Sequence, residues 1–169
     1  MNKQSIFFTI LVAIISVAIL LIILQFISKR QKINLGLEPQ INLSYSIWIS
    51  TIIISFAIFL KVALELIENS IEIIIHSNTI DNTFLAVIEK ISIFIGFTFL
   101  FTYISYYLIT IIMKMFSGNR NLNVEIDNNN IGYFIVKGVS LILFTFSILS
   151  IFEHFLKWFS PVVETPFYH

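Results

Sequence analysis

Four long apolar runs constrain this chain more than any other feature of its sequence. They cover residues 5–27, 43–60, 91–113 and 131–152. A helix needs about 20 mostly apolar residues to cross a bilayer, and each run approaches or exceeds that length. The sequence therefore predicts an all-α polytopic membrane protein with four transmembrane helices. We expect the second of them to continue as a mixed helix toward His76.

The charge content agrees with a chain that is surrounded by lipid. Only 12% of the residues are charged, whereas soluble domains carry about 25%. Ten basic residues balance ten acidic ones, so no excess of positive charge favours nucleic acid as a partner. The absence of cysteine excludes disulfides, thiolate metal ligands and cysteine nucleophiles. We expect one integral membrane domain over residues 1–169, embedded in a lipid bilayer and without a cofactor.

Lysine and arginine predict the orientation of the chain, because positively charged loops resist translocation. The connectors after the first and third runs hold five of these residues: Lys29, Arg30, Lys32, Lys114 and Arg120. The opposite side holds Lys3 and Lys157, and the acidic stretch around residues 65–89 lies there as well. Both termini are therefore predicted to lie outside. The first run is too long for the core of a signal peptide, about 7–15 residues, and is expected to remain as an anchor.

An internal duplication is indicated when the chain is shifted on itself by 88 residues. Asn42 then matches Asn130, Tyr45 matches Tyr133 and Glu65 matches Glu153. Two spans per repeat restore the same orientation, so residues of about 1–80 and 81–169 would form two parallel two-helix repeats. Each asparagine directly precedes an apolar run and is predicted to cap the helix that follows.

Residues 125–133, with the sequence EIDNNNIGY, lead from acidic and asparagine residues straight into a helix that carries Gly132 and Gly138. This stretch resembles the repeat of the bacterial inner-membrane family catalogued as domain of unknown function 350. Residues 38–45 form a weaker copy of it. The resemblance implies duplicated two-helix units in the bacterial inner membrane, with an asparagine before each even-numbered helix, and it implies no particular activity. The charged extension of residues 61–76 is not part of the family pattern.

One polar stripe follows the second apolar run, because its members share a narrow arc of a helix. They are Lys61, Glu65, Glu68, Glu72 and His76. A cation-attracting or proton-handling row is one interpretation. The preferred one is a solvated face with Lys61 paired to Glu65. A metal site that combines Glu72 and His76 with Glu153 and His154 has little support, because the three histidines of the chain share no metal-binding spacing.

Lys137 lies six residues into the fourth apolar run. A charge at that depth costs a few kcal/mol if it faces lipid, so we expect it to face another helix or a wet cavity. Gly132 and Gly138 are expected to allow close approach between helices. Single serines such as Ser55 and Ser105 are expected to donate hydrogen bonds between helices.

These features favour a non-enzymatic membrane protein that works by assembling, either with copies of itself or with an unidentified protein partner. Four helices with few polar groups hardly enclose an aqueous path, so a pore or ion-transport subunit would require an oligomer. Its path would be lined by Glu65, Glu153, Asn42 and Asn130. A membrane scaffold is the alternative, in which these residues serve only as caps and interface groups. An intramembrane enzyme is a more remote alternative.

Overall fold

The computed structural model describes residues 3–30, 42–76 and 82–161. These residues form helices and turns without any strand, which confirms the predicted all-α fold. The helices are α1 (Lys3–Arg30), α2 (Leu43–His76), α3 (Thr83–Ser117), α4 (Leu122–Asp127) and α5 (Ile131–Lys157). All but the short α4 are long and apolar enough to cross a membrane, so the chain has the build of a multi-pass membrane protein.

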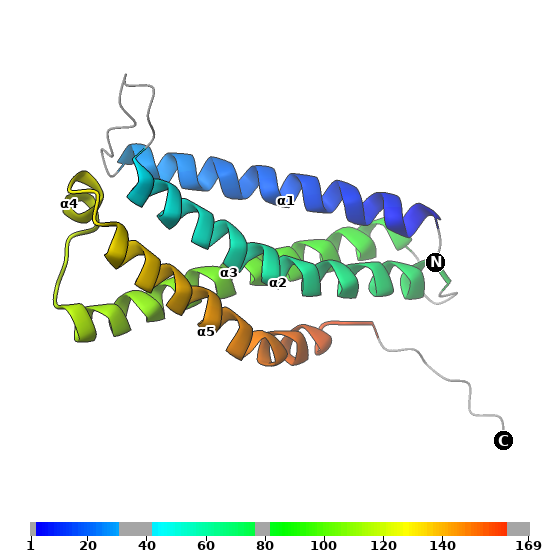
Figure 1. The fold of residues 1–169 in the computed structure, drawn as a ribbon. Coiled ribbons are helices and arrows are strands. Elements are labelled where there is room, and N and C mark those ends of the chain that lie inside the picture. Colours follow the sequence, from blue (N-terminus) through cyan, green and yellow to red (C-terminus); the bar gives the residue numbers. More distant parts are fainter. Residues whose placement is uncertain (1–2, 31–41, 77–81, 162–169) are drawn as a thin grey trace.

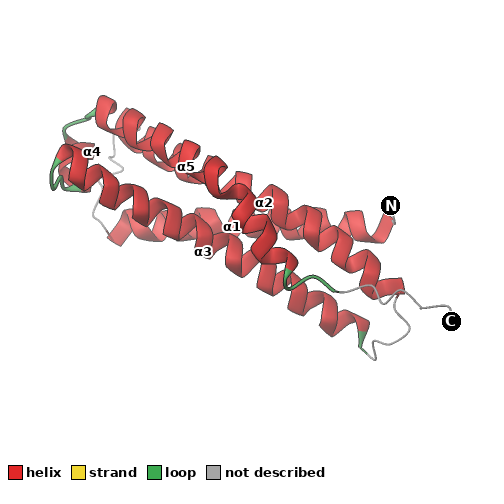
Figure 2. Ribbon diagram, turned by 90° about the horizontal axis from the view of Figure 1, so that it is seen from below, coloured by secondary structure: helices red, strands yellow, loops and turns green. Residues whose placement is uncertain are grey.

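The four long helices run side by side, and α4 lies at one end of the bundle (Figures 1 and 2). We call this end the α4 end. Helices α1 and α3 run toward it, and α2 and α5 run away from it (Figure 1). The described parts of the chain thus start and finish on the side opposite α4, in agreement with two parallel hairpins.

Helix α2 is the centre of the bundle. Of its apolar span, 44% is buried inside the structure, compared with 17% in α1 and 17% in α3. Helix α1 packs mainly against α2 through a stripe that repeats every four residues and includes Ser16, Leu20, Leu24 and Ser28. Such a stripe forms one face of a helix, so the remaining apolar surface of α1 is left for lipid.

Both α2 and α3 exceed the length of a simple span. The 34 residues of α2 extend about 51 Å at 1.5 Å per residue, whereas the hydrocarbon core is about 30 Å thick. The second half of α2 stays packed because Ile67, Ile71 and Ile74 are almost fully buried in one cluster with Val87 and Phe94 of α3. The apolar residues between the charges of the polar stripe therefore hold α2 and α3 together away from the α4 end.

The apolar core on this side is rich in phenylalanine. Phe59 of α2 lies 4.8 Å from Phe152 of α5 between ring centroids, and Phe101 of α3 lies 4.9 Å from Phe152. Aromatic pairs at these distances contribute beyond the area that they bury. Three helices thus meet on one set of rings.

Two boundaries differ from the sequence prediction. Helix α3 begins at Thr83, before the apolar run of residues 91–113, because the side chain of Asn82 accepts a hydrogen bond from the Leu85 amide at 3.1 Å. The connector between α3 and α5, for which no helix was predicted, contains α4. Lys32 and the acidic residue Asp81, both used in the topology prediction, lie outside the described residues, as do residues 38–41 of the first copy of the repeat.

Candidate functional site

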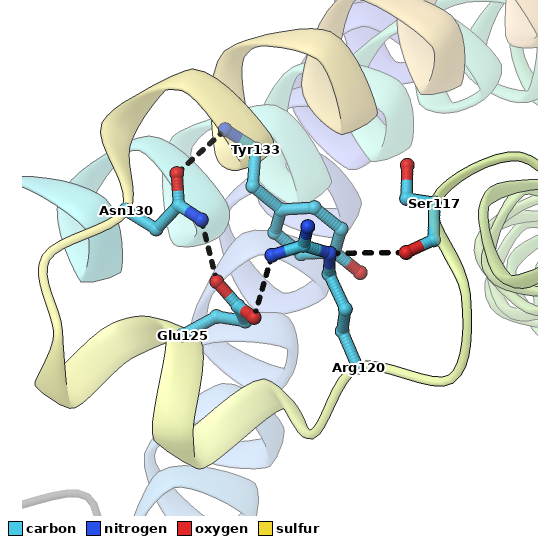
Figure 3. A network of polar contacts seen from close by, with 5 residues as sticks. All are labelled: Ser117, Arg120, Glu125, Asn130 and Tyr133. Atoms are coloured by element: carbon cyan, nitrogen blue, oxygen red, sulfur yellow. Dashed lines mark hydrogen bonds and ion pairs between the residues drawn. The ribbon is translucent and has the colours of Figure 1, made fainter.

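A polar network gathers at the α4 end and is centred on the Glu125 carboxylate (Figure 3). Arg120 donates from Nη1 to Glu125 Oε1 at 3.0 Å, and Asn130 donates from Nδ2 to Glu125 Oε2 at 2.6 Å. Arg120 is fixed in turn by donation from Nε to the Ser117 carbonyl at 3.1 Å, and its guanidinium lies 5.9 Å from the Tyr133 ring centroid. Both carboxylate oxygens are therefore engaged by groups on either side of α4.

The pKa of Glu125 is held below its ordinary value of 4.5. The hydrogen bond from Asn130 is the main cause, the hydrogen bond and charge of Arg120 add to it, and partial desolvation opposes it. The network thus favours the ionised carboxylate, which accepts both hydrogen bonds.

The three consecutive asparagines after α4 have three different roles. Asn128 is the C-cap of α4, and Asn129 adopts a left-handed conformation with φ 49°. The Asn129 amide donates to the Ile126 carbonyl and the Asn130 amide donates to the Glu125 carbonyl, which is the hydrogen-bond pattern of a Schellman motif. Asparagine tolerates this conformation better than most residues. The chain can therefore end α4 and start α5 within three residues.

Both predicted cap residues lie at helix starts. Asn130 Oδ1 accepts from the Tyr133 amide at 3.2 Å, and Asn42 Oδ1 accepts from the Ser44 amide at 2.9 Å. Asn42 also donates from Nδ2 to the Ile126 carbonyl of α4 at 2.7 Å, and Asn129 Oδ1 accepts from the Ser44 amide at 3.1 Å. Helix α4 therefore joins the start of α2 to the start of α5, and we call this set of contacts the α4 clamp.

A second polar group lies inside the bundle around Lys137, which is 4% exposed. Its Nζ donates to Tyr106 Oη of α3 at 3.3 Å and lies 4.6 Å from the Tyr106 ring centroid. Trp48 Nε1 of α2 donates to the same oxygen at 3.1 Å. The Tyr133 ring, 6.0 Å from Nζ, adds a weaker contact. Lys137 thus faces another helix, as predicted, and within the described part of the chain no carboxylate pairs with it.

The roles of Tyr106 and Trp48 in this group were not predicted from the sequence. Tyr106 is 31 residues from Lys137 and 58 from Trp48, so no local spacing links them. The available signal was chemical: an intramembrane lysine needs an acceptor, and a tyrosine hydroxyl can serve as one.

Glu65 and Glu153 are both held by a lysine of their own helix. Lys61 Nζ lies 3.8 Å from Glu65 Oε1, as predicted, and Lys157 Nζ lies 2.6 Å from Glu153 Oε1. Their positions are not equivalent relative to the helix ends: α2 continues to His76, about three turns beyond Glu65, whereas α5 ends one turn after Glu153. The structure does not bring them together with the caps.

The remaining residues of the polar stripe form no metal site. Glu68 and Glu72 are partly exposed, and His76 donates from Nδ1 to the Glu72 carbonyl at 2.7 Å. In residues 3–30, 42–76 and 82–161 no three His, Asp or Glu side chains gather in a way that could hold a metal ion. The partial exposure of Glu68 and Glu72 is compatible with a solvated face, which stays a prediction.

Two expectations about small residues need correction. A Cβ at Gly138 would overlap the Thr51 side chain, so Gly138 does allow α5 to approach α2 closely. Gly132 does not have this role, because it is exposed and a Cβ there would meet only Asn130 Oδ1 at 3.9 Å. Ser105 donates to the Phe101 carbonyl of its own helix at 2.8 Å, and the buried Ser55 hydroxyl has no partner among the described atoms. Back-bonding of this kind satisfies a hydroxyl without a second helix.

The α4 end therefore combines a structural clamp with a positive charge buried between helices. Such a charge can attract an anion, and it raises the energy of any cation nearby. Comparisons with protein-family models, with curated proteins and with solved structures found no match to this chain.

Proposed function

We propose that the chain is a non-enzymatic subunit of a membrane assembly and acts as a scaffold, with a second copy of itself as its first partner. The observation that carries this proposal is Gly96 on the outer side of α3. It is exposed, and a Cβ there would meet nothing within 4 Å, so packing inside the chain does not require glycine. Ser92 is exposed one turn earlier. Two small residues four apart allow the backbone of another helix to approach closely.

The α4 clamp supports the same proposal. Lipid is as apolar as the helix surfaces, so burial of apolar groups does not hold two hairpins together in a membrane. Polar contacts at the connectors can do so. The clamp joins the starts of α2 and α5 through Asn42, Asn129 and Asn130 and gives the subunit a defined shape on which an assembly can be built.

A pore-forming subunit, which the sequence analysis placed first, becomes the second candidate. Asn42 and Asn130 use their side-chain oxygens as caps, and Glu65 and Glu153 are paired with lysines of the same helix. The buried charge of Lys137 also disfavours a cation path through the bundle. The exposure of both carboxylates still favours an acidic ring at the mouth of an oligomer, where it would concentrate cations.

The oligomer tests the scaffold proposal directly. Native mass spectrometry of the full chain from lipid nanodiscs should show a multimer, and Gly96→Leu should convert most of it to monomer. Gly132→Leu is the matched control, because Gly132 is also exposed but lies on α5, and it should leave the multimer intact. A monomeric wild-type chain would refute the proposal, and an unchanged multimer in Gly96→Leu would refute the α3 interface.

Ion flux separates the two candidates. Liposomes that contain the chain should show no cation flux above empty liposomes if it is a scaffold. If flux occurs, Glu65→Gln combined with Glu153→Gln should reduce it at constant oligomer size, and that result would replace the scaffold with the pore.

We further propose that the chain lies in a bacterial inner membrane with both termini outside, as its family resemblance and its lysine and arginine residues indicate. The described residues at the α4 end support this orientation, because they include Lys29, Arg30, Lys114 and Arg120. Since the chain has no cysteine, single cysteines give a clean test. In intact cells an impermeant thiol reagent should label Thr83→Cys and spare Asn119→Cys, both at exposed positions at opposite ends of α3. The reverse pattern would refute the orientation.

A further inference from the structure

An apolar groove with a volume of about 390 Å³ is lined by α1, α2 and α3. Its walls include Leu24 and Ile27 of α1, Ile52 of α2 and Phe99 of α3. All three helices are candidate membrane spans, so lipid is the medium around the groove. A lining that is almost entirely apolar favours a hydrocarbon chain over a polar solute.

The size of the groove limits the width of its occupant. A helix is about 10 Å across with its side chains, so a helical segment over the distance of about 10 Å from Leu20 to Ile27 would need roughly 800 Å³. The groove offers about half of that volume. One alkyl chain therefore fits better than a helix of a second copy.

Two residues of the groove wall belong to the polar group around Lys137. Trp48 Nε1 and Lys137 Nζ both donate to Tyr106 Oη, at 3.1 Å and 3.3 Å. Trp48 and Tyr106 both line the groove. The ammonium group of Lys137 thus lies one hydrogen bond behind a residue of the groove wall.

The charge of Lys137 is not balanced within the described residues. Lys137 is 4% exposed and takes part in none of their ion pairs. The charge that acts on it comes from a second cation, Lys114. Glu125 of α4 is already engaged by Arg120 and Asn130. Because a buried charge without a counter-charge is costly, an anionic group in the groove would stabilise the bundle.

The polar group lies at the end of the groove that faces α4. Trp48 and Lys137 follow the starts of α2 and α5 by five and six residues, which is about 8–9 Å, and both helices start at the α4 end (Figure 1). Phe99 comes seven residues before Tyr106 on α3, which runs toward α4, so the apolar part of the groove extends away from that end. An occupant would therefore have its polar group toward the membrane boundary and its tail toward the middle of the bilayer.

This depth favours a carboxylate that is attached directly to an alkyl chain. In a phospholipid, glycerol separates the phosphate from the acyl chains, and the phosphate stays in the headgroup layer outside the hydrocarbon core. The carboxylate of a fatty acid has no such spacer, so it can approach a cation that lies two helical turns inside the helix starts.

We propose that the groove binds a long-chain fatty acid, with its carboxylate beside Tyr106 and Lys137 and its alkyl chain along Ile52 and Phe99. The carboxylate supplies the counter-charge that the described residues do not give to Lys137. This inference does not depend on the scaffold proposal, because it requires only that the chain lies in a bilayer.

Trp48 provides a local probe of the groove. The chain has two tryptophans, so Trp158→Phe leaves Trp48 as the only one, and Trp48 lines the groove. We would reconstitute this full-length variant in phosphatidylcholine vesicles and titrate dibromostearic acid, whose bromine atoms quench tryptophan fluorescence on contact. The methyl ester of the same acid is the matched ligand, because it has the same chain and no charge. Brominated phosphatidylcholine gives the quenching by ordinary lipid.

We expect half-maximal quenching at about a tenfold lower mole fraction of the acid than of the ester, which is the size of a hydrogen bond to a charged group. Lys137→Met and Lys137→Gln should each bring this ratio close to one, because both remove the charge. Glutamine keeps a donor for Tyr106 and gives the result if the methionine variant does not fold. Lys29→Gln is the control, because it removes an exposed charge at the α4 end of α1 and should leave the ratio unchanged.

Four outcomes would overturn the proposal. Equal quenching by the acid and the ester, a comparison that needs no change at Lys137, would show that the carboxylate is not recognised. A preference that persists without the Lys137 charge, or that is lost equally in Lys29→Gln, would show that another charge attracts the acid. Equal quenching by brominated phosphatidylcholine would show that any acyl chain enters. No quenching by any of the three would show that the groove is closed to lipid, as when a second copy of the chain covers it.

Discussion

Gly138 gives the sharpest test of how the bundle is packed. A Cβ added at this position would overlap the Thr51 side chain, with the Thr51 methyl group as its nearest neighbour. Helix α5 therefore contacts α2 at a distance that only glycine permits. Replacement of Gly138 by alanine must push the two helices apart or move Thr51.

The expected size follows from two opposing terms. Alanine is favoured over glycine inside a helix by about 1 kcal/mol. Overpacking of a well-packed contact costs about 1–3 kcal/mol. Gly138→Ala should therefore lower the free energy of unfolding by up to about 2 kcal/mol. At the exposed Gly132 the same change meets no obstacle and should be neutral or slightly stabilising.

The second substitution Thr51→Ser tests the cause. It removes the overlapping methyl group but retains the hydroxyl, which donates to the Trp48 carbonyl at 2.9 Å. In this background Gly138→Ala should no longer destabilise the chain, which corresponds to a coupling energy of about 1–3 kcal/mol. The assay is reversible unfolding by sodium dodecyl sulfate in mixed micelles, followed through tryptophan fluorescence. A coupling energy of zero, or a Gly138→Ala variant that is more stable than wild type, would refute the close contact.

Three further predictions concern the polar groups. The stabilisation from Glu125 should be fully present above its ordinary pKa of 4.5 and should be lost as the pH falls through its lowered folded pKa. The hydrogen-exchange protection factors of α4, which divide out the intrinsic pH dependence of exchange, should therefore fall in that range in wild type and stay constant in Glu125→Gln. Asn130→Ala should destabilise the chain by about 1 kcal/mol through loss of the cap. Asn130→Asp should restore the cap, but its carboxylate should repel Glu125. If aspartate restored wild-type stability in dodecyl sulfate unfolding, that result would contradict the network. Lys137→Met should leave the free energy of unfolding unchanged or raise it, because apolar replacement of a buried charge is often neutral or stabilising. A loss of more than about 3 kcal/mol would show that the contacts of the lysine outweigh the cost of burying its charge.

The sequence was sufficient for the features that depend on neighbours along the chain. The four apolar runs predict the four long helices, because a membrane span needs a continuous apolar stretch and no other element can satisfy its backbone there. Asn42 and Asn130 are recognisable as caps because a cap acts on amides only two or three residues away. The pair of Lys61 and Glu65 follows from its spacing of four residues. Helix α4 escaped prediction because six residues show too little periodicity.

The candidate site depended on contacts between distant parts of the chain. Lys137 was expected to find a partner, but only the packing of α3 against α5 decided that the partner is Tyr106. Similarly, the sequence presents Gly96, Gly132 and Gly138 as three helical glycines, and only the positions of neighbouring helices show that Gly138 alone is enclosed. The physical reason is the range of each interaction. Apolar runs, caps and spacings of four act within one helix, whereas burial and interhelical hydrogen bonds depend on which helix faces which, and apolar surfaces of similar composition do not specify that in advance.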